Sequence, residues 1–185
     1  MPLFKGKASK AKPKKAIDYI TNPQKAVIIS SQSLDDNRNY AVQFKEICDI
    51  YGKGSKSDER KYYHFKLSCN PADNPTPQQS HELAEKLAQQ LFSEYECVIA
   101  THNDTDTLHS HIMVNAVSFE TGKKLHMNNS AYRYSKDLAD EWAYLQWTGA
   151  PRPKKSENEA KQAKPSPPRV NIYHQPSRTW LKMGI

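Results

Sequence analysis

Three of the seven histidines lie within one stretch of ten residues, at His102, His109 and His111. His109 and His111 are two residues apart at the start of a run of strand-forming residues, so their side chains leave the same face of a strand. His102 ends the preceding run of strand formers. If the two strands pair as a hairpin, the three imidazoles converge. Because three ligands with open positions are typical of catalytic metal sites, we predict a divalent metal there.

The loop between these strands carries two aspartates, Asp104 and Asp106. Either carboxylate is placed to accept an imidazole N–H and fix the tautomer of a ligand. Asp18, on the short helix expected at 16–20, is expected to face solvent, so Asp104 is a better candidate than Asp18 for orienting a histidine or receiving a proton. The alternative is that all of these are polar hairpin residues without a special role. The other histidines are isolated in sequence and are expected to be surface or packing residues, namely His64, His81, His126 and His174.

The flanking sequence indicates which elements position these histidines. Short strands are expected at 27–30, 61–68, 95–101 and 112–119, where β-branched, aromatic and alternating apolar residues occur. Helices are expected at 16–20, at 40–50, from Pro77 onward behind a Thr-Pro-Gln-Gln capping box, and at 130–147. This order predicts an α+β fold, an antiparallel sheet with helices packed on one face, which leaves the other face free to meet DNA.

The length of 185 residues suits one domain of about 120 to 150 residues with a tail. We expect a basic N-terminal segment at 1–15 and a folded domain at 16–150. Residues 151–169 have the Pro- and Lys-rich composition of a linker. Residues 170–185 regain apolar side chains and are expected to dock on the domain or to begin a further region.

The net charge of +7 favours a polyanionic partner, and nucleic acid is favoured over a membrane because all apolar runs are short. Residues 5–15 contain six lysines, a run that is either a solvated tail or a phosphate contact. No secretory h-region follows this basic start, so a cytoplasmic protein is expected. The three cysteines are far apart and lack a C-x-x-C pair, which favours reduced packing residues over a disulfide scaffold or a zinc ribbon.

Three motifs together resemble a known family over roughly residues 14–148. The run 102–115, followed by Thr-Gly-Lys-Lys at 121–124, closely resembles the third motif of MOBP-like mobilisation relaxases, which are HUH endonucleases. Residues 65–71, FKLSCNP, are similar to the strand and turn before the long helix of that family. Residues 16–25, AIDYITNPQK, resemble its first motif, in which the tyrosine is the nucleophile.

The resemblance implies an N-terminal nicking domain that cleaves one DNA strand at a transfer origin. Tyr19 then attacks a phosphodiester and keeps the 5′ phosphate, in the service of conjugative mobilisation of a plasmid or transposon. A free tyrosine has a pKa near 10, so Tyr19 needs help from a cation or a base. The alternative role of Tyr19 is packing. Three imidazoles suit Mn²⁺, Co²⁺, Ni²⁺ or Zn²⁺ better than Mg²⁺, which prefers oxygen, whereas the family implies Mg²⁺ or Mn²⁺ in use.

Single-stranded and origin DNA are the implied partners, with accessory mobilisation and coupling proteins beside them, in the cytoplasm of a bacterium. Asn115 shares the expected strand face of His109 and His111 and is a candidate to bond DNA. Two departures from the family pattern concern Thr107, where many relatives have a histidine, and Asp73, where they have a glutamate. The remaining candidate DNA contacts are lysines of the first and third motif regions, namely Lys12, Lys14, Lys15, Lys123 and Lys124.

Two other functions stay open. A related HUH replication initiator or transposase would use the same chemistry, but here the tyrosine precedes the histidines, as in relaxases, whereas replication initiators place it after them. A non-catalytic DNA-binding module that retains the metal site belongs to a different class. Nicking of an origin oligonucleotide separates these alternatives.

Overall fold

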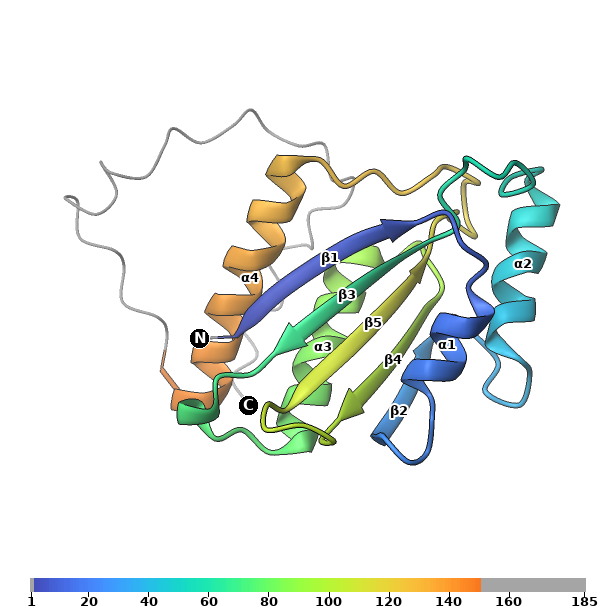
Figure 1. Ribbon diagram of the computed structural model, residues 1–185. Helices are drawn as coiled ribbons and strands as arrows, with labels where there is room; N and C mark the ends of the chain where they lie inside the picture. The colour runs from blue at the N-terminus through green and yellow to red at the C-terminus, as the bar shows by residue number, and fades with distance from the viewer. Residues whose placement is uncertain (1, 151–185) are drawn as a thin grey trace.

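The computed structural model describes residues 2–150 (Figure 1). The expected linker at 151–169 and the segment at 170–185, which includes His174, lie outside the described residues. Within 2–150 the expected order of strands and helices is present, preceded by one additional strand.

Five strands form one sheet in the order β1-β3-β5-β4-β2, and every neighbouring pair is antiparallel (Figure 1). The antiparallel α+β fold is therefore confirmed. The hairpin of β4 and β5 occupies the inner part of the sheet, with β2 on one side and β3 on the other. The strands are β1 (Leu3–Ser9), β2 (Ala26–Gln32), β3 (Tyr62–Ser68), β4 (Cys97–His102) and β5 (His109–Asn115).

Three helices connect strands and a fourth follows β5, and three of the four begin at a capping side chain. The expected capping box is present: the Thr76 side chain accepts from the Gln79 backbone N–H, and the Gln79 side chain accepts from the Thr76 backbone N–H. Asn39 and Asn128 cap two other helices in the same way, each accepting from a backbone N–H three residues on. The helices are α1 (Lys14–Ile20), α2 (Tyr40–Ile50), α3 (Pro77–Phe92) and α4 (Asn129–Thr148), with a 3₁₀ turn η1 (Pro71–Asp73) before α3.

The helices cover both faces of the sheet, which corrects the expectation that they pack on one face (Figure 1). Helices α3 and α4 pack on the face that carries Phe65, Ile99 and Ile112. Helices α1 and α2 pack on the opposite face, against Val98 and Met113. Every residue of β4 and β5 is buried, because both faces of these two strands are covered. Strands of this kind lack the alternation of buried and exposed residues that marks a sheet with one free face.

The N-terminal segment also differs from its expectation as a separate basic stretch. Its first part is β1, an edge strand that pairs with β3 along its whole length. Phe4 is 2% exposed and stacks on Phe65, while Lys5 and Lys7 point to solvent. Gly6 is required at its position because a Cβ there would lie 2.4 Å from the Phe65 ring. One buried aromatic residue among the lysines therefore joins this segment to the core.

Candidate metal and nucleophile site

The hairpin of β4 and β5 brings the three predicted histidines together. Register pairs His102 with His109 across the hairpin, and His111 lies opposite Ala100. One ring nitrogen from each imidazole falls within 4.8 Å of the others, and all three side chains are buried. The sequence-based grouping of these residues is therefore matched by the geometry.

Two of the imidazoles are oriented by backbone carbonyls. His102 Nε2 donates to the carbonyl of Ile20 at 2.7 Å, and His109 Nδ1 donates to the carbonyl of Thr107 at 2.8 Å. His102 Nδ1 is buried and has no hydrogen-bond partner within residues 2–150. A buried nitrogen without a partner is costly, and a metal ion bound by that nitrogen removes the cost. The tautomers set by these carbonyls leave His102 Nδ1 and His109 Nε2 as ligand atoms.

The third imidazole is oriented by a histidine that the sequence pattern did not single out. His64 Nε2 lies 2.9 Å from His111 Nδ1, and His111 Nε2 is buried without a partner in the described part of the chain. His64 stands on β3, where its neighbour Lys66 pairs with His111 in register. The signal in the sequence was the alternation of β3, which places His64 opposite the apolar side chains, but the β3–β5 pairing was needed to interpret it.

The electrostatics favour the neutral form of His109 and His111, which is the form that binds metals. Burial, followed by the nearby histidines, lowers the pKa of His111 to about 2. Burial also lowers the pKa of His64 and of His109 from the ordinary value of 6.5. The donor set therefore fits a divalent transition metal: three imidazoles, each with one nitrogen held by the protein.

Tyr19 lies beside this cluster on α1. Its side chain is 48% exposed, and its ring centroid is 6.0 Å from that of His102 and 6.2 Å from that of His111. The residue after it is Ile20, whose carbonyl accepts from His102, so one hydrogen bond ties the end of α1 to the histidine cluster. The only predicted nucleophile thus stands at the cluster with a side chain open to a substrate.

A cation and a carboxylate complete the surroundings of Tyr19. The Lys25 ammonium lies 5.0 Å above the Tyr19 ring and 3.1 Å from Asp104 Oδ2, while Asp104 Oδ1 is 3.9 Å from His102 Nδ1. The hydrogen bond from Lys25 lowers the pKa of Asp104, and the same bond raises the pKa of Lys25. Lys25 was missed as a site residue, although it ends the stretch that resembles the first family motif. Asp18 faces solvent, as expected, and pairs with Lys14 at 2.6 Å.

The opposite face of the same hairpin is anchored to α3 by hydroxyl groups. Thr101 and Ser110 alternate with the histidines, and their hydroxyls lie 2.7 Å apart. Ser80 on α3 bonds Ser110 at 2.8 Å, and His81 bonds Thr101 at 2.9 Å. His81 is 2% exposed, in line with the packing role expected for it. These bonds make the hairpin a rigid base for the imidazoles on its other face.

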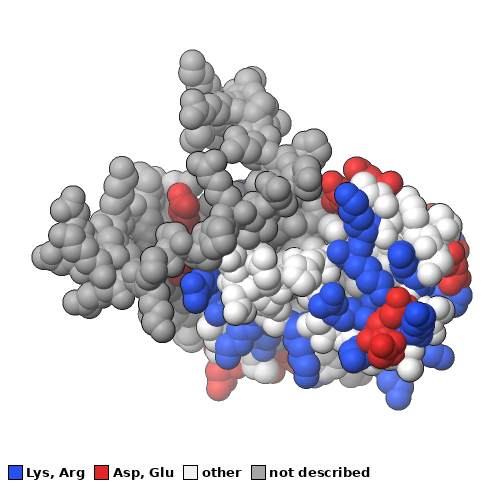
Figure 2. Space-filling model, turned by 90° about the horizontal axis from the view of Figure 1, so that it is seen from above, with Lys and Arg blue, Asp and Glu red and all other residues white. Residues whose placement is uncertain are grey.

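The predicted DNA-contacting lysines fall in two places. Lys12, Lys14 and Lys15 lie at the start of α1 and are exposed. Lys123 and Lys124 follow β5 and so lie at its far end, about 20 Å from His109 along a seven-residue strand. Lys124 pairs with Glu59 there at 2.9 Å. Figure 2 shows that basic side chains gather on the described surface on the side where α2 lies.

Asn115 is a correction, because it has no side-chain atom available to DNA. It is fully buried, and its Nδ2 donates to the Phe44 carbonyl at 3.0 Å and to Glu96 Oε2 at 2.8 Å. Its Oδ1 accepts from the Val117 N–H at 3.3 Å and from the Cys48 thiol at 3.6 Å. The face was predicted correctly, but α2 covers this end of it.

A sequence model described as "Relaxase: MobA/VirD2-like, nuclease domain" matches residues 19–144, which begin at Tyr19 and include the whole histidine cluster. The chain belongs to this relaxase family. A relative named "Protein rlx" from Staphylococcus aureus is 32% identical over 128 residues, which is 62% of this chain and 39% of the relative. "Protein TraI" from Escherichia coli is 32% identical over 127 residues, 66% of this chain and 17% of that protein. This relaxase chain therefore spans well under half the length of these two relatives.

Solved relaxase domains share the fold. Two structures of the "MobM Relaxase Domain", described as Mn-bound and bound to plasmid pMV158 oriT DNA, superpose with TM-scores of 0.56 and 0.57 at 12% and 14% identity. They cover 87% and 88% of this chain and 97% and 99% of their own. At this identity the likeness concerns the fold. Among residues 2–150, no helix of this relaxase is both long enough and apolar enough to cross a membrane.

Proposed function

We propose that this relaxase nicks one DNA strand at a transfer origin, with Tyr19 as the nucleophile and a divalent metal held by His102, His109 and His111. The observation that carries the proposal is the position of an exposed tyrosine about 6 Å from two imidazoles whose second nitrogens are held by the protein. The family membership and the printed descriptions of the solved MobM domains, which are bound to oriT DNA and Mn, support it.

The proposed reaction is a transesterification. The Tyr19 phenolic oxygen forms a bond to the scissile phosphorus as its own proton leaves, the bond from phosphorus to the 3′ oxygen breaks, and that oxygen takes up a proton. The product is a 5′-phosphotyrosine with a free 3′ hydroxyl, and the reverse step rejoins the strand. When bound, the cation supplies positive charge to the non-bridging oxygens of the phosphate.

The neighbouring side chains have distinct proposed roles. The Lys25 ammonium lies over the Tyr19 ring, where its positive charge stabilises the negative charge that develops during the attack. Asp104 holds Lys25 at 3.1 Å and lies beside His102, so it positions both. Asp104 acts by positioning and not by proton transfer, because its pairing with Lys25 lowers its pKa and makes it a weak base.

The donor set also predicts the order of metal affinity. Three neutral imidazoles bind Mn²⁺ more tightly than Mg²⁺, because Mg²⁺ prefers oxygen ligands and keeps its water. Isothermal titration calorimetry with each ion checks this order. Equal affinities would contradict an all-imidazole site.

The decisive experiment compares wild type with Tyr19→Phe on labelled single-stranded origin DNA in the presence of Mn²⁺, with covalent adducts separated on a denaturing gel. We expect the adduct to form in wild type and to disappear in Tyr19→Phe. The matched control is Tyr134→Phe, since Tyr134 is 44% exposed on α4, on the face of the sheet opposite the histidines. An adduct that survives in Tyr19→Phe would move the nucleophile elsewhere.

The second candidate is a DNA-binding module that keeps the metal site without nicking. DNA binding by wild type without any adduct on its cognate origin would favour it. The order of the tyrosine before the histidines continues to favour a relaxase over an HUH replication initiator or transposase. Action on bacterial DNA in the cytoplasm and cooperation with accessory mobilisation and coupling proteins are parts of the same proposal.

A further inference from the structure

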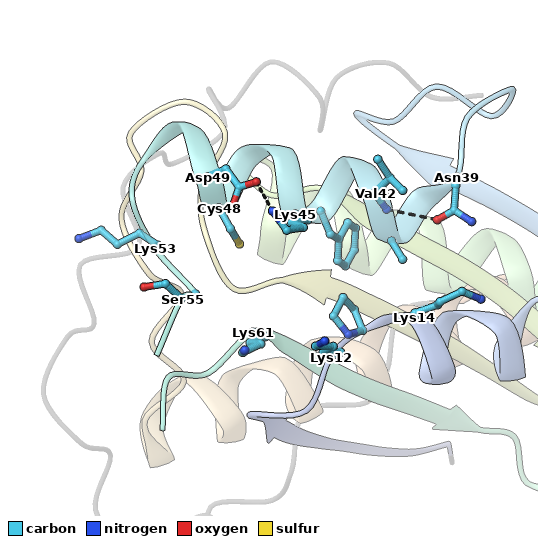
Figure 3. Close-up of a pocket in the computed structure, with 14 residues that line it drawn as sticks. Lys12, Lys14, Asn39, Val42, Lys45, Cys48, Asp49, Lys53, Ser55 and Lys61 are labelled. Atoms are coloured by element: carbon cyan, nitrogen blue, oxygen red, sulfur yellow. Dashed lines mark hydrogen bonds and ion pairs between the residues drawn. The ribbon is translucent and has the colours of Figure 1, made fainter. Parts of the chain in front are cut away.

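A cavity of about 570 Å³ opens between α1 and α2 (Figure 3). It lies between the segment that leads into α1, one side of α2, and the loop from residue 52 to residue 61. Its apolar wall consists mainly of Pro13, Ala41, Val42, Phe44 and Cys48. Lysines surround this wall from three segments of the chain, namely Lys12, Lys14, Lys45, Lys53 and Lys61.

The charge of this lysine-lined groove is strongly positive. Asp49 is the one acidic residue in its lining, and it is neutralised by an ion pair with Lys45 on the same helix. Within the described residues, Lys12, Lys53 and Lys61 form no ion pair. Three uncompensated ammonium groups around one apolar surface attract a polyanion.

The apolar wall restricts which polyanion fits. Val42 is 51% exposed on α2, and an exposed apolar side chain inside a basic groove offers a surface for the faces of unstacked bases. In duplex DNA the base faces are stacked on one another, and proteins contact its phosphates and the base edges in its grooves. The bases of a duplex therefore cannot pack against this apolar wall. The combination of a lysine rim and an apolar wall is typical of sites for single-stranded nucleic acid.

The groove is also continuous with the proposed nicking site. Lys14 begins α1 and lines the groove, and Tyr19 follows five residues later, about 7.5 Å along the helix axis. Phe44 in the wall of the groove packs in the same core as Ile17 and Ile20 of α1. A strand that leaves Tyr19 along α1 therefore reaches the groove within a few nucleotides.

We propose that the lysine-lined groove between α1, α2 and the 52–61 loop binds single-stranded DNA next to the scissile phosphate. This inference rests on the proposed function, since it assigns a binding surface to the same substrate. Phosphates lie against Lys12, Lys53 and Lys61, and bases lie against Val42. The groove adds affinity for the strand without contributing to the chemistry at Tyr19.

The test uses the full chain and the double variant Lys53→Glu/Lys61→Glu. The matched control is Lys86→Glu/Lys136→Glu, which makes the same change of charge on exposed positions of α3 and α4. Fluorescence anisotropy with a labelled 20-nucleotide oligothymidylate, in EDTA and at several salt concentrations, measures binding without nicking.

We expect the groove variant to bind at least about tenfold more weakly than the control variant. The slope of log affinity against log salt concentration should become less steep by about 1.4, since each lost phosphate contact on a single strand accounts for about 0.7. Mn²⁺ affinity should equal that of wild type. Equal affinities of the two double variants for the oligonucleotide would overturn the proposal.

Two further outcomes are informative. If the groove variant lost affinity for a duplex of the same length but kept its affinity for the single strand, the base-stacking site would be overturned. Binding of polyglutamate, but not of the oligonucleotide, to the groove of wild type would also overturn it. Because binding is measured in EDTA, the result does not depend on nicking. If wild type nicks DNA and the groove variant binds the oligonucleotide as tightly as the control variant, only the groove proposal is refuted. If the groove variant binds more weakly but wild type forms no Tyr19 adduct, only the nicking proposal is refuted.

Discussion

The two ends of β5 carry polar side chains on the same face, yet they differ in what those side chains are free to do. At the first end, His111 keeps a buried Nε2 with no hydrogen-bond partner in residues 2–150. At the other end, Asn115 uses both Nδ2 hydrogens and its Oδ1 on the protein itself. Strand periodicity therefore places both ends on one face but does not distinguish a ligand from an anchor.

The difference arises from what covers each end. Helix α2 and Glu96 meet Asn115, and together they supply the Phe44 carbonyl and a carboxylate as acceptors. Among residues 2–150, the helix beside the histidine end is the short α1, and its Ile20 carbonyl accepts from His102 on the neighbouring strand β4 and not from β5. At the histidine end a buried nitrogen therefore lacks a hydrogen-bond partner, as expected of a site that takes a ligand. At the asparagine end the polar side-chain atoms all have partners, as expected of a structural contact.

The largest expected effect is on metal affinity at the histidine end. His111→Ala removes one of three ligand nitrogens, and we expect Mn²⁺ affinity to fall by more than about 100-fold. Loss of a residue that only hydrogen-bonds a ligand typically lowers metal affinity by about 10- to 100-fold. The free energy of unfolding of the metal-free protein should change little, because removal of the partnerless Nε2 offsets loss of the bond between His111 Nδ1 and His64. Calorimetry and urea denaturation check the two parts. Unchanged Mn²⁺ affinity would remove His111 from the site.

The opposite pattern is expected for Asn115→Ala. It leaves the Phe44 carbonyl and the Glu96 carboxyl without their partner, so the free energy of unfolding should fall by about 2 to 3 kcal/mol. Mn²⁺ affinity of the folded protein should stay the same. Asn37→Ala, at an exposed position, is the control and should cost less than about 0.5 kcal/mol. Equal stability of the two variants would mean that the two ends of β5 do not differ as described.

A smaller effect should follow from His64→Ala, which removes the group that orients His111. We expect Mn²⁺ affinity to fall by about 10- to 100-fold, with partial recovery in His64→Gln, whose amide oxygen can accept from His111 Nδ1. His126→Ala, at an exposed histidine, is the control. A loss that Gln does not restore would point to a general packing defect instead of an orienting bond.

The smallest effect concerns the pH dependence at the asparagine end. Burial raises the pKa of Glu96 above its ordinary value of 4.5, and the hydrogen bond from Asn115 opposes that rise. The folded state therefore favours the protonated acid, so its contribution to stability is complete below about pH 4.5 and is lost as the pH rises through the folded pKa. Glu96→Gln mimics the protonated form.

Urea denaturation of Glu96→Gln should accordingly show higher stability than wild type at pH 7, with a difference that shrinks toward zero below pH 4.5. If wild type is the more stable protein at pH 7, the charged bond to Asn115 outweighs the cost of burial.

Local sequence patterns predicted most of the helices and strands and the grouping of the three histidines. Capping residues such as Thr76 and the alternation of β3 act locally, and they predicted the helix and strand positions that the structure shows. The spacing of His102, His109 and His111 sufficed to group them, because a hairpin brings neighbouring segments together without help from distant parts of the chain.

Long-range packing determined which side chains surround the histidines and which are covered. His64 reaches His111 through the β3–β5 pairing, and Lys25 reaches Asp104 across the fold, so neither contact follows from local spacing. Asn115 was assigned to the correct face, but the packing of α2 on that face determined its partners. Long-range pairing and burial depend on the whole chain, and a local pattern cannot encode them.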